Sequence, residues 1–328
     1  MWRWQTVTGD ECRDSEEEEE EAALREERAG RLRCAFSACA CLLLLWVLPL
    51  RPRPPPVTLG EPRPPPEYSH EQLASHRAFG MYVADVIDRQ SSCVPDRTSV
   101  ISLTNEYYTN ITALQMATMP RCVLPRTALY CSRTLATFAP ARSFRDHCFV
   151  SNEDMSPGPF QTDEYTLLII LKWRLMARAL QSSDAVLFLD ADVLVIHDPF
   201  PALAGITTPL AMQRVSYGNP FHPMKNHVNS GVVWLRSHAL ALVLEKVVSS
   251  PYDGELDQDA VQRYLDVQNP PRHTLLPTCF AGHPWARWSF VRFLIMLKHK
   301  AFVTYHAHGV HGIDNKLAVL RHVAETTP

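Results

Sequence analysis

The chain has 328 residues and a formal net charge of −3, with 32 basic and 35 acidic side chains. This length allows one domain of roughly 240 residues with a sizeable core, preceded by an N-terminal appendage. The near-neutral charge, without a basic stripe, argues against a nucleic-acid-binding protein.

Three segments of different composition precede the domain. Residues 1–33 contain the acidic run Glu16 to Glu21, which predicts a solvated tail. Residues 34–50 carry no charge and have arginines on both sides, which predicts a short transmembrane anchor. An uncleaved anchor is favoured over a signal peptide, because a long charged region precedes the apolar segment and bulky residues follow it. Residues 51–70 are rich in proline and predict an extended stem.

The arginines before the apolar segment favour a cytosolic N-terminus, which would place residues 71–328 in the lumen. The short span suits the thinner membranes of the early secretory pathway, so we expect a single-pass type II protein of the Golgi membrane. In an oxidising lumen, two disulfides and one remaining thiol are expected from Cys93, Cys122, Cys131, Cys148 and Cys279. Their spacing does not give the pairing.

Strands and helices are predicted to alternate along residues 71–328. Short strands are expected at 99–103, 127–131 and 148–150, and helices at 110–119 and 165–180. A buried strand then ends at Asp190. A polar turn at 229–231 leads into another strand, and helices follow at 238–248 and from Asp257. This order predicts an α/β sandwich with a mainly parallel central sheet.

The apolar run 185–196 is the most informative segment, because it carries two carboxylates, Asp190 and Asp192. Residues two apart in a strand point the same way, so the two carboxylates are expected to converge at the strand's end. Like charges this close repel unless a cation lies between them, and carboxylate oxygens suit a hard divalent cation. Ligands of open α/β sheets collect at the carboxyl ends of the strands. The segment therefore predicts a metal and phosphate site.

Two later segments carry further polar groups. Asp257 and Asp259 lie in the first turn of a predicted helix, where helix capping and a role in a site are both open. Residues 306–311 contain three histidines, among them His306 and His308. An imidazole nitrogen can be a third ligand to a metal held by two carboxylates, and Lys316 would supply positive charge to a diphosphate.

With these motifs in this order, the chain resembles the nucleotide-diphospho-sugar transferases of the metal-dependent GT-A fold. Within that class it is most similar to the retaining family that contains plant and protist galactosyl-, xylosyl- and arabinosyltransferases. The resemblance covers about residues 98–322 and includes the run FLDADVLVIHDPF at 188–200. It implies a hexosyl- or pentosyltransferase that moves a sugar from a nucleotide-diphosphate donor to a glycan or glycoprotein acceptor, with retention. It also implies a Mn²⁺ or Mg²⁺ cofactor.

The resemblance assigns roles to individual residues. The metal ligands would be Asp190, Asp192 and His306, with Asp190 also near the nucleotide ribose. The family often has Asn two places after the metal-binding histidine, where this chain has His308, so His306 and His308 both stay open as the ligand.

Other roles concern the donor and the reaction. Asp257 and Gln258 are the catalytic candidates, because either could stabilise an oxocarbenium-like transition state. The donor contacts would be Thr104 and Asn105 at the nucleoside, Asn229 at the sugar, and Gly312 and Lys316 at the diphosphate, with Lys172 as a basic side chain that faces the donor.

Two alternatives belong to other classes. One is a catalytically silent, membrane-anchored binding or scaffold protein that keeps this fold. The other is a haloacid-dehalogenase-like phosphatase, which also uses two aspartates two residues apart. That motif normally opens its domain and prefers Thr or Val where this chain has Leu194.

Overall fold

The computed structural model describes residues 67–326, apart from 138–140, 142, 154, 156–162, 215–226, 251–255, 269–272, 278, 283–301, 309 and 311. The predicted acidic tail, the predicted anchor and the stem before residue 67 lie outside the described residues. Among the helices that are described, none has the length and apolar character needed to cross a membrane.

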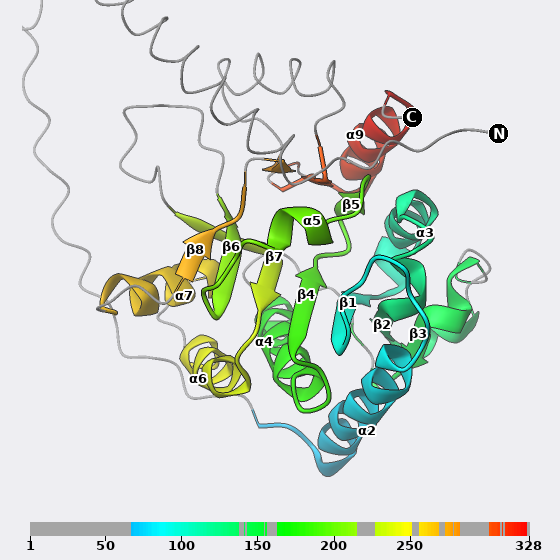
Figure 1. Ribbon diagram of the computed structural model, residues 1–328. Helices are drawn as coiled ribbons and strands as arrows, with labels where there is room; N and C mark the ends of the chain where they lie inside the picture. The colour runs from blue at the N-terminus through cyan, green and yellow to red at the C-terminus, as the bar shows by residue number, and fades with distance from the viewer. Residues whose placement is uncertain are drawn as a thin grey trace, which may run out of the picture.

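A seven-stranded sheet forms the centre of the described domain, in the order β3-β2-β1-β4-β7-β6-β8 (Figure 1). Its strands are β1 (Thr98–Thr104), β2 (Thr127–Cys131), β3 (Cys148–Val150), β4 (Ala185–Leu189), β6 (Leu210–Arg214), β7 (Val228–Leu235) and β8 (His273–Leu275). Only β7 pairs antiparallel with its two neighbours, and the other pairings in this sheet are parallel. The predicted α/β fold with a mainly parallel sheet is confirmed.

A small second sheet extends the first beyond the carboxyl end of β4. It contains β5 (Val193–Val195), β10 (Thr304–His306) and β9 (Phe280–Gly282). Strand β10 runs antiparallel to β5, and this register sets His306 opposite Val193. A histidine more than a hundred residues downstream is thereby brought to the turn that follows β4.

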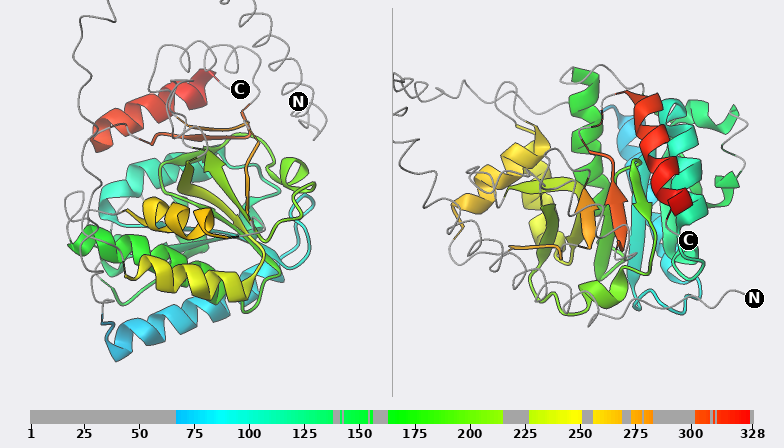
Figure 2. Two further views of the ribbon diagram at one scale, coloured as in Figure 1. Left: turned by 90° about the vertical axis from the view of Figure 1, so that its left-hand side faces the viewer. Right: turned by 90° about the horizontal axis from the view of Figure 1, so that it is seen from above.

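Helices cover the large sheet. One core cluster joins it to α2 (His70–Ile87), α4 (Asp163–Ala179), α6 (His238–Val248) and α7 (Asp257–Asp266). Figure 2 shows α2, α4 and α6 gathered on one side of the sheet, with α9 (Ile313–Thr326) on the other. In β4, Val186 and Phe188 pack in this cluster, while Leu187 and Leu189 pack in the opposite one, as the alternation of a strand buried on both faces requires.

The remaining elements are short or peripheral. Helix α3 (Thr109–Thr118) contacts α9, and both belong to a third core cluster together with β5 and β10 residues. Helix α5 (Phe200–Leu203) and four 3₁₀ turns complete the described elements: η1 (Glu106–Tyr108), η2 (Leu124–Arg126), η3 (Arg133–Thr137) and η5 (Arg145–His147).

The predicted elements agree with the observed ones in all but two places. Asp192 does not belong to the strand predicted to end at Asp190, because the chain turns at 190–192 and enters the second sheet as β5. Residues 229–231 are not a turn before a strand, since β7 already begins at Val228. Both differences concern polar residues inside an apolar context, where the paired strands rather than the local sequence decide the conformation.

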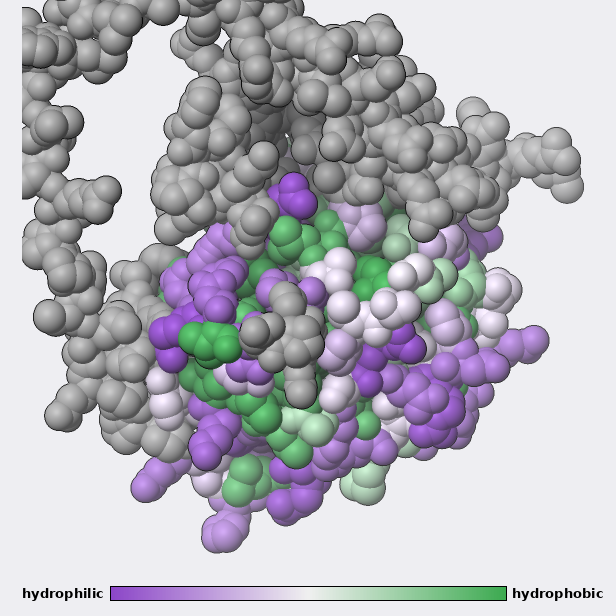
Figure 3. All heavy atoms as spheres, turned by 60° about the vertical axis from the view of Figure 1, so that its left-hand side comes forward, coloured by the Kyte–Doolittle hydropathy of each residue, from purple (hydrophilic) through white to green (hydrophobic). Residues whose placement is uncertain are grey.

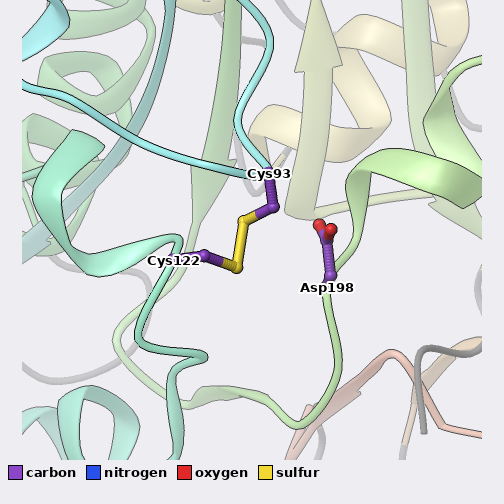
Figure 4. A group of neighbouring side chains, drawn as sticks. All are labelled: Cys93, Cys122 and Asp198. Carbon is purple, nitrogen blue, oxygen red and sulfur yellow. A yellow bond between two sulfur atoms is a disulfide. The ribbon is translucent and has the colours of Figure 1, made fainter. Parts of the chain in front are cut away.

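The described residues form two disulfides, the number expected for this domain. Cys93 pairs with Cys122, with their Cα atoms 5.6 Å apart, and Cys131 pairs with Cys148 at 5.9 Å. The buried Cys279 takes part in neither. Asp198 lies beside the first disulfide (Figure 4), but disulfide sulfurs are not thiolates and this trio is therefore no metal site.

Exposed apolar side chains are spread over the described surface. They include Met81, Tyr107, Val150, Leu167, Leu242, Val243 and Val267. On the face shown in Figure 3, hydrophobic residues are interspersed with hydrophilic ones. Scattered exposure of this kind is ordinary for a globular surface and does not by itself mark a docking site.

Candidate active site

The predicted site residues gather at the carboxyl edge of the large sheet. Asn105 follows β1 and Asp190 follows β4, and these two strands run parallel. Because β7 runs antiparallel to β4, its first residues also lie at this edge, and Leu189 pairs with Val232. This edge is where open α/β sheets bind their ligands.

A rigid turn carries the two carboxylates. The Asp190 N–H donates to the Gly231 carbonyl at 2.8 Å, which ties the turn to β7. From α3, the buried Gln115 donates through Nε2 to the carbonyls of Asp190 at 3.0 Å and Val193 at 2.8 Å. Asp190 and Asp192 thus lie close together because hydrogen bonds hold the turn that carries them. The strand alternation suggested by the sequence is not the reason.

Three predicted metal ligands lie together. Asp190, Asp192 and His306 offer ligand atoms that are all within 4.8 Å of one another. Asp192 and His306 are buried, and His306 Nε2 lies 3.3 Å from Asp192 Oδ1. Two carboxylates and an imidazole are a donor set that divalent cations such as Mn²⁺ accept, so these residues fit the implied metal. His308 does not belong to this group, although its ring centroid is 5.1 Å from that of His306.

Gln213 fixes the orientation of the His306 ring. Its amide Nε2 donates to the Phe280 carbonyl at 3.0 Å, so its Oε1 faces His306 Nδ1 at 2.8 Å as an acceptor. A proton on Nδ1 then leaves the Nε2 lone pair directed at the carboxylates. Partners of this kind set the tautomer of metal-binding histidines.

Residue 231 must be glycine, because the His306 ring lies too close to leave room for a side chain there. A Cβ atom built on Gly231 would lie 2.0 Å from His306 Cε1, closer than real Cβ contacts come. The neighbouring Asn229 accepts the Gly231 N–H at 2.8 Å, which holds the start of β7 in place. The Asn-Ser-Gly segment therefore serves to admit the imidazole to the carboxylate turn.

Lys316 contributes positive charge from α9. Its Nζ donates to Asp192 Oδ2, while His306 faces the other oxygen. Burial acts to lower the pKa of Lys316, but Asp192 outweighs it and raises that pKa. Burial likewise acts to raise the pKa of Asp192, but the Lys316 ammonium outweighs burial and holds that pKa far below the usual range. Asp192 is therefore a carboxylate, the form that binds a metal.

Burial raises the pKa of Asp190, and the charge of Asp192 adds to the rise, although Lys172 opposes it. The Asp190 side chain remains 34% exposed, so it is the member of the pair that a ligand can reach from solvent. A cation near both carboxylates would relieve their mutual repulsion.

Lys172 is a buried cation at the centre of a second cluster. Its Nζ donates to Asp257 Oδ2 at 2.7 Å, to Ser230 Oγ at 2.9 Å and to the Ser230 carbonyl at 3.2 Å. An ammonium has three N–H groups, and these contacts match them in number. Asp190 Oδ1 lies farther off, at 3.8 Å. Lys172 thus points at other site residues, and its contact with a donor stays a prediction.

The start of α7 answers the question left open for its two aspartates. Asp259 accepts the Leu256 N–H through Oδ2 at 3.2 Å, which is helix capping. Asp257 instead pairs with Lys172, among the other predicted site residues, and its catalytic role stays a prediction. Gln258 Oε1 accepts from Asn229 Nδ2 at 3.3 Å, so both catalytic candidates lie beside the start of β7.

Three other predicted donor-binding residues, Thr104, Asn105 and Gly312, form hydrogen bonds within the protein. Thr104 and Asn105 are buried, and their side chains bond within the protein: Thr104 Oγ1 to Thr112 Oγ1 at 2.6 Å, Asn105 Nδ2 to the Met155 carbonyl at 2.8 Å. Asn105 Oδ1 also accepts two N–H groups of η1. Gly312, at φ +83°, sits just before α9, where its carbonyl accepts the Lys316 N–H at 3.0 Å.

Four side chains of the site were missed by the sequence reasoning: Gln115, Trp173, Gln213 and Ser230. Gln213 had a usable signal, because it is a polar residue near the carboxyl end of an apolar strand, like Asp190. Gln115 and Trp173 face inward from helices, where a buried polar contact leaves no trace in the sequence pattern.

Comparison with known proteins bears on this arrangement. Residues 136–320, more than half of the chain, match the family described as nucleotide-diphospho-sugar transferase. A comparison with curated protein sequences gives no match.

Several solved structures are similar. The WbbM bifunctional glycosyltransferase has a TM-score of 0.44 at 11% identity, covering 74% of this chain and 50% of that one. Mouse xyloside xylosyltransferase 1 has 0.40 at 13%, covering 65% and 98%. The galactosyltransferase LgtC, with donor and acceptor sugar analogues, has 0.42 at 11%, covering 70% and 96%. The chain thus spans half of WbbM, and likenesses this weak carry no conclusion about substrates.

Proposed function

We propose that this chain, which belongs to the nucleotide-diphospho-sugar transferase family, is a metal-dependent glycosyltransferase. It would move a hexose or pentose from a nucleotide-diphosphate donor to a glycan or glycoprotein acceptor, with retention of the anomeric configuration. The observation that carries the proposal is the group of Asp190, Asp192 and His306 at the carboxyl edge, inside the matched region. The family match argues against the alternative of a haloacid-dehalogenase-like phosphatase.

The proposed roles follow from charge and position. Asp190, Asp192 and His306 would hold Mn²⁺ or Mg²⁺, which supplies positive charge to the leaving diphosphate. Lys316, at the N-terminal turn of α9, would exchange Asp192 for a diphosphate oxygen and add charge where negative charge develops. Asn229 would line the donor sugar, and Thr104, Asn105 and Gly312 would shape the nucleoside and diphosphate ends through their backbone.

The reaction itself is a substitution at the sugar's anomeric carbon. A bond forms between the acceptor oxygen and the anomeric carbon, while the bond between that carbon and the diphosphate oxygen breaks. The acceptor's proton passes to the departing diphosphate. Asp257 or Gln258 would stabilise the oxocarbenium-like charge that develops on the sugar during this exchange. Both are placed for this role, because Asp257 contacts Lys172 and Gln258 contacts Asn229.

Donor hydrolysis tests the proposed function directly. The purified full-length chain, given Mn²⁺ and a panel of UDP-glucose, UDP-galactose, UDP-xylose and GDP-mannose, should release nucleoside diphosphate from at least one donor. Chelation of the metal should stop the release. If every donor stays intact and unbound, the chain is the silent scaffold that the sequence left as an alternative.

The histidine pair has a specific expected result. His306→Ala should raise the Mn²⁺ concentration needed for half-maximal donor hydrolysis by on the order of tenfold or more, because it removes a ligand. His308→Ala, the matched control, should shift that concentration far less. An equal response of the two variants would show that the predicted ligand assignment is wrong.

We also propose residues 1–33 as a cytosolic tail, 34–50 as the anchor, 51–70 as the stem and 71–328 as a luminal Golgi domain. The two disulfides support an oxidising compartment. Protease added to sealed microsomes should shorten the chain only by its N-terminal tail. Digestion of the catalytic domain in intact vesicles would contradict this orientation.

A further inference from the structure

We propose that Trp173 is a positioning residue for Asp257: its indole N–H and Lys172 hold one oxygen of that carboxylate, so that the other is presented to the donor sugar. This rests on the proposed function and deepens it, because it assigns the sugar contact to a single oxygen atom. Trp173 received no role from the sequence or from the family match.

The indole is placed for this task. Trp173 is fully buried in α4, and its Nε1 donates to Asp257 Oδ2 at 3.1 Å. The neighbouring Lys172 donates to the same oxygen at 2.7 Å. Neither bond uses Oδ1. Two donors on one oxygen fix the rotation of the carboxylate about its Cβ–Cγ bond, which a single donor leaves broad.

The Trp173 ring also lies next to the ammonium group of Lys172. Lys172 Nζ lies 5.9 Å from the Trp173 ring centroid and 5.5 Å from that of Phe188. These rings and the contacts to Ser230 leave Lys172 little freedom. Since Lys172 cannot turn away, Asp257 Oδ2 keeps both of its donors.

The chemistry of the carboxylate indicates what its second oxygen, Oδ1, would bind. Burial acts to raise the pKa of Asp257, but Lys172 and the hydrogen bonds from Lys172, Ser230 and Trp173 lower it overall. A carboxylate only accepts hydrogen bonds. Since Lys172 and Trp173 both use Oδ2, Oδ1 would accept a hydrogen bond from a hydroxyl of the donor sugar.

The chain provides a matched control for Trp173. Trp234 in β7 is also buried, at 5% exposure, and its indole N–H has no hydrogen-bond partner among the described residues. Trp173→Phe and Trp234→Phe therefore make the same chemical change, but only the first removes a hydrogen bond to a site residue.

The first measurement asks whether the contact exists, and it needs no substrate. Urea unfolding of wild type, Trp173→Phe, Asp257→Asn and the double variant should give non-additive changes in the free energy of unfolding. The same cycle with Trp234→Phe should be additive. Additivity in the Trp173 cycle would overturn the contact and the proposal with it.

The second measurement separates positioning from structural support. In calorimetric titrations with Mn²⁺, Trp173→Phe should bind the donor found in the panel about tenfold more weakly than wild type. It should bind the donor's nucleoside diphosphate, which lacks the sugar, with unchanged affinity. Trp234→Phe should bind both like wild type.

Each result has a clear meaning. If Trp173→Phe bound the donor and the nucleoside diphosphate with equally weakened affinity, or bound both like wild type, Trp173 would have only a structural role and the proposal would be overturned. If wild type bound none of the panel, the proposed function would fail, and the unfolding cycle alone would still report the Trp173–Asp257 contact.

Discussion

Asp192→Asn is expected to lower donor hydrolysis and sugar transfer on the order of a hundredfold or more. Asparagine keeps the shape of the side chain but removes the charge that a divalent cation requires. The buried Asp192 also faces His306 through one oxygen and Lys316 through the other, so the amide disturbs two further predicted functional groups. Turnover should be measured at saturating donor over a range of Mn²⁺ concentrations.

Asp184→Asn is the matched control for this change. Asp184 precedes β4, and its side chain is 68% exposed and pairs with Arg97 on the surface. The same isosteric substitution should leave turnover unchanged there. Near-normal turnover by Asp192→Asn, with its circular dichroism like that of wild type, would remove Asp192 from the proposed metal site.

Lys172→Met is expected to be the most destabilising of the conservative changes in this site. Lys172 and Asp257 are both buried, and removing one member of a buried ion pair leaves the other uncompensated, at a cost of about 3–5 kcal/mol. Asp190 would lose a neighbouring positive charge as well. Urea unfolding measures the loss, and donor hydrolysis should fall with it.

Two comparisons test this explanation. Lys246→Met makes the same change on the exposed face of α6, and its free energy of unfolding should stay close to that of wild type. Combining Lys172→Met with Asp257→Asn should recover part of the lost stability, because the buried negative charge is then gone. A double variant as unstable as the sum of both changes would refute the uncompensated-charge explanation.

The sequence was sufficient for most of the fold. Strands 127–131 and 148–150 and helix 238–248 were predicted with the bounds that the structure has, because each is a short apolar or amphipathic run between clear breaks. The strand alternation expected for Asp190 and Asp192 was wrong, because the apolar run 185–196 continues through a turn at 190–192. Its side chains stay buried because β5 packs in a second sheet, and that pairing depends on residues 304–306 far along the chain.

The site was predictable as a set of charges but not as a geometry. Asp190, Asp192 and His306 stand out by residue type and position. The supports of the site, Gln115 and Gln213, are single buried amides whose partners lie 67 to 93 residues away. No periodic pattern marks such contacts, because each depends on which strands and helices become neighbours.

The reversed direction of β7 divides the loops of this domain into two kinds. In a wholly parallel sheet, the start of β7 would lie at the far edge, and Asn229 to Gly231 could not reach the carboxylate turn. In the observed sheet, Arg214 at the end of β6 and Val228 at the start of β7 both lie at the carboxyl edge that holds the predicted site residues, whereas Arg236 and Ser237 lie at the opposite edge. Under the proposed function, segments inserted between 214 and 228 would therefore be free to diversify what the domain binds. Additions between β7 and α6 would sit a full strand length away and leave the chemistry untouched.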